Sequence, residues 1–134
     1  MPIDYRVDHT RRLVHATACE DLTDQDVFGY QYEVWSREEV AGYDELVDMT
    51  DVQHIEVPSS DRLKELVQLA AGMDLPNTPT KFAIVAPDRL SYDLARFFQV
   101  YRQIDPRSTK KVEVFRTMPE ALDWLGTETR PEAR

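Results

Sequence analysis

Apolar and polar residues alternate strictly at the start of the chain. The alternation over residues 3–8 predicts a strand with one face in water. After a polar turn, residues 13–18 predict a second strand, and the two are expected to pair as an antiparallel hairpin. The uninterrupted apolar run Phe82–Ala86 is typical of a strand covered on both faces. Two shorter runs predict the remaining strands, at Leu46–Met49 and Val112–Phe115.

Four segments carry the start signals and periodicity of helices. Thr23 with Asp26 three residues later resembles a capping box and predicts a helix over residues 24–37. Ser59 and Ser60 precede apolar residues spaced at i, i+3, i+4 and i+7. A strongly amphipathic helix is expected from Leu90 to Tyr101, and a capped helix is expected between Thr117 and Gly126.

The resulting order of elements is β-β-α-β-α-β-α-β-α. Alternating strands and helices imply right-handed crossovers and a mainly parallel, five-stranded sheet with an antiparallel first strand and helices on both faces. We therefore predict a single α/β domain over residues 1–126. Residues 127–134 have no apolar stripe and are expected to form a frayed, flexible tail.

Composition narrows the functional classes. A chain of 134 residues that is 42% hydrophobic is long enough for one packed domain. Its net charge of −9 argues against nucleic acid or an anionic membrane as the main partner. A single cysteine, Cys19, excludes an intrachain disulfide and fits a reducing cytoplasm. No apolar run approaches the ~20 residues that span a bilayer.

The charge is unevenly distributed along the chain. Residues 1–67 hold 16 acids and 6 bases, whereas residues 68–134 hold 9 acids and 10 bases. Between Glu20 and Glu56 twelve acids accompany one base, Arg37. This stretch is either a solvated face that keeps the protein in solution or a surface that steers a basic partner protein.

The pattern resembles the SpoIIAA-like group, which includes the STAS domains of anti-sigma-factor antagonists and of sulfate transporters. The resemblance is most concrete at residues 46–52, followed by Ile55 and the serines that open the next helix. Trp35-Ser36-Arg37 is similar to the end of the first helix in bacterial members without an assigned activity. The fold is shared with lipid-carrying domains of the Sec14 type.

The resemblance implies a regulatory phosphosite at Ser59 or Ser60. Antagonists of this kind carry a phosphorylated serine in an Asp-Ser-Ser-Gly motif, but here the stretch Glu56–Asp61 contains a proline and lacks the glycine. Helix capping is the alternative role for these serines.

Polar residues near the predicted strand ends form a second candidate site. In doubly wound sheets ligands bind beyond the carboxyl ends of parallel strands. The candidate residues for such a crevice are Asp48, Thr50, Asp51, Asp88, Arg89, Arg116 and Thr117. Neither a metal site nor a catalytic residue is predicted, because no histidines, thiols or serines have the required spacing. No cofactor is expected.

Two helices offer apolar surface for a partner or a ligand. Aromatic residues of the first helix are the candidate interface of a homodimer or another protein contact, at Phe28, Tyr30, Tyr32 and Trp35. In the third helix Leu94, Phe97, Phe98 and Tyr101 are either core residues or the lining of a pocket for an apolar molecule. We expect a non-enzymatic interaction module of the STAS type; the alternative is a carrier or sensor of a small apolar or anionic ligand.

Overall fold

The computed structural model describes residues 2–126, which form a five-stranded sheet with four α-helices. Its strands lie in chain order across the sheet and are β1 (Ile3–Asp8), β2 (Leu13–Leu22), β3 (Asp44–Ile55), β4 (Thr80–Val85) and β5 (Lys110–Phe115). The β1–β2 pair is antiparallel and the other pairs are parallel. The predicted fold class is confirmed.

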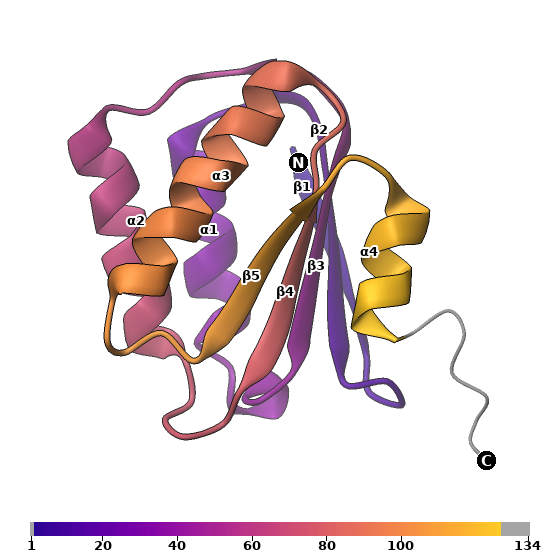
Figure 1. The fold of residues 1–134 in the computed structure, drawn as a ribbon, viewed down its shortest axis with the longest axis vertical. Coiled ribbons are helices and arrows are strands. Elements are labelled where there is room, and N and C mark those ends of the chain that lie inside the picture. Colours follow the sequence, from indigo (N-terminus) through magenta and orange to yellow (C-terminus); the bar gives the residue numbers. More distant parts are fainter. Residues whose placement is uncertain (1, 127–134) are drawn as a thin grey trace.

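The helices that follow β2, β3 and β4 cover one face of the sheet, and the helix that follows β5 covers the other (Figure 1). The helices are α1 (Asp24–Trp35), α2 (Ser60–Met73), α3 (Arg89–Ile104) and α4 (Met118–Leu125), with a short 3-10 helix at Glu38–Val40. Right-handed crossovers that all advance in the same direction place α1, α2 and α3 on the same face. Only α4, which follows the last strand, lies on the opposite face.

The one-directional strand order changes the expectation for a ligand crevice. A crevice at the carboxyl ends forms where the order of parallel strands reverses, because neighbouring connections then leave on opposite faces. From β2 to β5 the order never reverses. Between β2 and β5 the sheet therefore has no switch point of this kind.

Strands β2 and β3 are longer than predicted. The two strands pair as far as Leu22 and Ile55, whereas β4 ends opposite Asp48. They continue past the rest of the sheet as a two-stranded ribbon, with register shifts after Thr17 and after Glu20. Acidic residues inside β3 hid this extension, because a half-exposed strand tolerates polar residues that interrupt an apolar run.

The ends of the helices agree with the capping signals predicted from the sequence. Thr23 and Asp26 form a complete capping box at α1, and Gly126 ends α4 in the left-handed conformation with φ 76°. The predicted tail at residues 127–134 lies outside the described residues. None of the helices within residues 2–126 is both long and apolar enough to cross a membrane.

Candidate functional site

A cavity of about 150 Å³ lies between the sheet and the three-helix layer. Helix α2 packs mainly against α1 and α3, and its Leu63 and Leu66 line the cavity opposite the sheet. Side chains from the other elements complete an apolar lining, including Ala18, Val27, Val47, Met49, Ile55, Phe82, Ile84, Leu94, Ala95 and Phe98.

Several apolar side chains that line this cavity are only partly buried, which indicates that packing around it is incomplete. Val47 lies on the central strand β3, under the helical layer, yet it is only partly buried. Leu63, Leu66 and Leu94 face inward and are also partly buried. Protein cores normally pack as densely as organic crystals, so inward-facing apolar side chains that remain accessible indicate space for another molecule.

Glu45 supplies the polar end of the cavity. Its carboxylate accepts hydrogen bonds from Tyr30 Oη at 2.7 Å and from Trp35 Nε1 at 3.1 Å. The other oxygen pairs with Lys110 Nζ at 2.8 Å, and both charged side chains are almost fully buried. Burial and the nearby Glu45 charge raise the pKa of Tyr30 well above its usual value, so its hydroxyl stays a donor.

Lys110 lies between Glu45 and the aromatic ring of Trp35. Its Nζ is 3.1 Å from the Trp35 ring centroid, a cation–π contact that partly replaces lost hydration. Burial lowers the pKa of Lys110, and the Glu45 charge opposes that shift. The ammonium is therefore held by protein groups on two sides.

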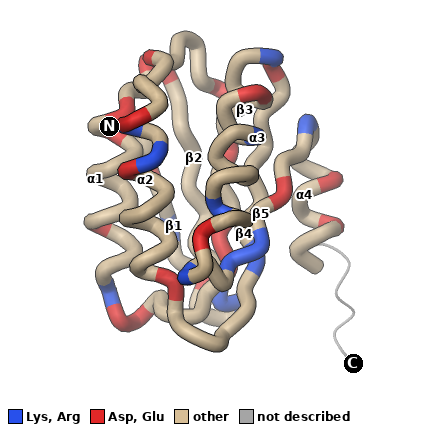
Figure 2. Tube along the Cα trace, turned by 60° about the vertical axis from the view of Figure 1, so that its left-hand side comes forward, with Lys and Arg blue, Asp and Glu red and all other residues tan. Residues whose placement is uncertain are grey.

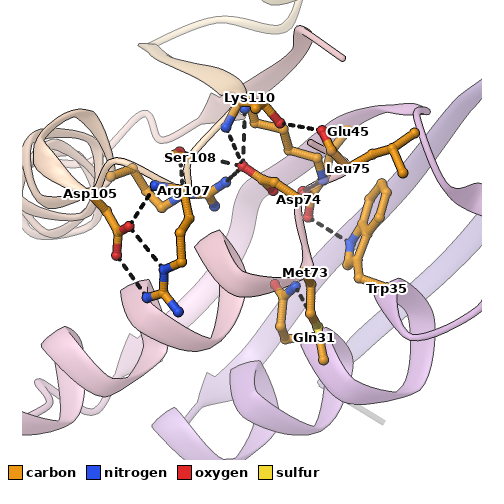
Figure 3. A network of polar contacts seen from close by, with 12 residues as sticks. Gln31, Trp35, Glu45, Met73, Asp74, Leu75, Asp105, Arg107, Ser108 and Lys110 are labelled. Carbon is orange, nitrogen blue, oxygen red and sulfur yellow. Dashed lines mark hydrogen bonds and ion pairs between the residues drawn. The ribbon is translucent and has the colours of Figure 1, made fainter. Parts of the chain in front are cut away.

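A second buried ion pair lies beside the first (Figure 3). Arg102 Nη2 donates to Asp74 Oδ2 at 2.6 Å, and the same oxygen accepts from the backbone N–H groups of Thr109 and Lys110. Asp74 caps the end of α2, whereas Lys110 begins β5. The Asp74 carboxylate thus ties the end of α2 to α3 and the start of β5.

Arg62 connects α2 to α1 at the edge of the cavity. Its Nε donates to Asp24 at 2.9 Å, its Nη1 donates to Glu65 at 3.0 Å, and its guanidinium lies 4.1 Å from the Phe28 ring centroid. The hydrogen bond from Arg62 lowers the pKa of Asp24. Arg62 and Phe28 also line a groove on the outer side of α1 and α2, so they separate the cavity from that groove.

The expected pocket residues of α3 divide into two groups. Leu94 and Phe98 line the cavity. Phe97 instead faces solvent with 57% of its surface exposed, and Tyr101 lies beside Lys64 of α2. The helical period therefore directs only part of the apolar stripe towards the sheet.

The structure places the predicted strand-end residues on several different elements. Asp48, Thr50 and Asp51 lie within β3, and Thr50 donates to Asp48. Asp88 and Thr117 act as N-caps of α3 and α4. Arg89 pairs with Asp93, whereas Arg116 donates to the Pro87 carbonyl and lies over the Tyr92 ring. Most of these side chains therefore have a local structural role.

Ser59 and Ser60 open α2 in the predicted position. Ser59 is the N-cap, and its hydroxyl accepts from the backbone N–H of Arg62 at 3.1 Å. Ser60 is the first helical residue and is exposed. The capping role expected for this pair is therefore filled by Ser59.

The candidate interface on the first helix needs correction. Tyr30 and Trp35 are 8% and 9% exposed, because their polar atoms turn inward to Glu45. Only Tyr32 is well exposed, and Phe28 is partly covered by Arg62. These four residues do not form one open aromatic surface.

Sequence reasoning missed Glu45 and Lys110. Glu45 belongs to an acidic stretch and Lys110 to a basic one, so both are typical of surface residues when considered one at a time. Their separation of 65 positions leaves no local signal for pairing. The one available signal was the position of Glu45 directly before the apolar strand segment Leu46–Met49.

Comparison with known proteins supports the fold. An uncharacterized protein of the DUF3478 family from Shewanella loihica has a solved structure with a SpoIIAA-like fold. It matches with a TM-score of 0.56 at 19% sequence identity, over 92% of this chain and 93% of that chain. No protein-family model and no curated protein matches the sequence. The present chain therefore has a SpoIIAA-like fold.

Proposed function

We propose that this protein is a non-enzymatic domain that binds a small molecule in the cavity beneath α2. The observation that carries the proposal is the cavity of about 150 Å³ with its apolar, partly accessible lining. Ligand sites are typically concave and mostly apolar, with a few polar groups at fixed positions. The cavity has this composition, with Glu45 and Tyr30 at one end.

A binding role agrees better with the polar groups than a catalytic role does. A general acid or base must reach the substrate, and a nucleophile needs a base beside it. Glu45 and Tyr30 are instead engaged with each other and with Trp35 and Lys110. Within residues 2–126 no group of three or more His, Cys, Asp or Glu side chains is arranged to hold a metal ion.

Native mass spectrometry of the protein purified from its own cells tests this function. We expect a bound small molecule that dissociates on denaturation. Val47→Phe fills the cavity from the central strand and should abolish the bound mass, whereas Val100→Phe, on the exposed side of α3, should retain it. A wild-type protein that carries no ligand and binds none from an apolar compound library would contradict the proposal.

An exposed apolar row on α3 favours a second candidate function, a protein-interaction module. Four of the large exposed apolar residues lie on this helix with spacings of seven, three and four, at Leu90, Phe97, Val100 and Ile104. Exposed apolar patches often mark contact sites in soluble proteins. The row lies near Arg89 and Arg96, so an acidic partner surface would complement it.

Paired substitutions test the interaction module. Phe97→Asp should abolish co-purification of a specific partner or self-association in solution. Leu75→Asp, at an exposed apolar residue outside α3, should leave both unchanged. Equal behaviour of the two variants would rule out the α3 row as the contact surface.

A further inference from the structure

We infer that the ligand of the cavity is a compact, uncharged apolar molecule about the size of a single aromatic ring. This inference rests on the proposed binding function and restricts its ligand class. A cavity of about 150 Å³ matches in size the dry engineered core cavity that accepts benzene or xenon.

At the polar end of the cavity, Glu45 and Tyr30 are already engaged with protein partners. Glu45 already accepts from Tyr30, Trp35 and Lys110, with both of its oxygens engaged. The Tyr30 hydroxyl donates to Glu45 and accepts from Trp35. A polar group of a ligand that lies against these two residues would lose its hydrogen bonds with water without gaining theirs, which costs about 1–3 kcal/mol for each buried group.

The charges around the cavity disfavour an anion. Three acids line it, Asp24, Glu45 and Glu56, against one base, Arg62. Arg62 is committed to Asp24 and to Glu65, so its charge is already balanced by neighbours. An anionic group entering here would meet excess negative charge and no free cation.

A cation is disfavoured for a different reason. Of the three lining acids, Glu45 already has Lys110 at 2.8 Å and Asp24 is paired with Arg62. Glu56 is exposed to water and would not hold a cation inside the cavity. A second buried cation beside Lys110 would suffer like-charge repulsion and lose its hydration. The two arguments together leave neutral apolar molecules as the class that the cavity accepts without breaking existing bonds.

Three probes of the same ring size separate these classes: toluene, benzoate and benzylamine. Each is titrated into the full chain at neutral pH, and binding is followed by amide NMR shifts of the residues that line the cavity. We expect toluene to bind at least tenfold more tightly than either charged probe. Val47→Phe should weaken toluene binding at least tenfold, while Val100→Phe keeps the wild-type affinity.

The possible failures are distinguishable. Tighter binding of benzoate or benzylamine at cavity residues would overturn the ligand class and leave the binding function standing. Failure of all three probes, together with the absence of a co-purified molecule, would overturn both proposals. Toluene binding that Val47→Phe does not weaken would place the ligand outside this cavity and also overturn the inference. Melting curves establish that both valine variants are folded.

Discussion

Glu45 and Lys110 show how residue-scale chemistry determines one end of the cavity. Two opposite charges are buried together, and two aromatic residues supply further contacts to them. Taking charges out of water is costly, so such a pair contributes little net stability while each member depends strongly on the other. This dependence makes the pair a sensitive site for substitution.

Lys110→Met tests that dependence. It leaves the Glu45 charge buried without its counter-ion and should lower the free energy of unfolding by about 3–5 kcal/mol. Adding Glu45→Gln removes the uncompensated charge and keeps an acceptor for Tyr30 and Trp35. The double variant should therefore be more stable than Lys110→Met alone in urea unfolding. A double variant that is less stable would contradict the account.

Individual helices and strands were predictable to the extent that their signals are local. Thr23, Ser59 and Gly126 define helix ends through contacts within a few residues, and all three act as expected. Strand β3 was underestimated because Asp48 and Asp51 interrupt its apolar pattern. Its full length depends on pairing with β2, which is not encoded within the segment itself.

The first turn of α2 provides a matched pair of serines. Ser59→Ala removes the hydroxyl that accepts from Arg62 N–H and should cost about 1 kcal/mol of unfolding free energy. Ser60→Ala, one position later, lacks a comparable capping bond and should change stability by less than about 0.5 kcal/mol. If both variants lost the same unfolding free energy in chemical denaturation, the Ser59 cap would not be the source of the effect.

At the scale of the whole molecule, the order of elements predicted the sheet but not the cavity. Right-handed crossovers explain why three helices share one face (Figure 1). The space beneath α2 depends on how far that helix sits from β3, and side chains from four strands and three helices set that distance. No sequence window contains this information. The exposure of the α1 aromatic residues was mispredicted for the same reason, since two of them point inward and donate hydrogen bonds to Glu45.

Net charge is also a property of the whole molecule. Acidic residues occur on helices and connecting segments alike (Figure 2), and the chain carries −9 overall. Self-repulsion of this kind destabilises a compact state, and salt screens it. Raising NaCl from about 0.01 M to about 1 M should increase the free energy of unfolding by on the order of 1 kcal/mol.

A matched variant tests the source of this salt effect. Glu20→Gln, Asp21→Asn and Asp51→Asn together remove charge from the β2–β3 ribbon, where these residues are exposed. The triple variant should show a smaller salt dependence in urea unfolding than the wild type. Stability that falls with added salt would mean that surface ion pairs outweigh repulsion.

The arrangement of strands in chain order also bears on how the protein is made. Each strand joins the sheet beside the one synthesised just before it, so no later strand has to insert between two earlier ones. A nascent chain emerging from the ribosome is thus able to extend its sheet one βα unit at a time, and the incomplete edge is always the most recent strand. Synthesis and assembly proceed in the same direction, which shortens the time that unpaired strands are open to aggregation.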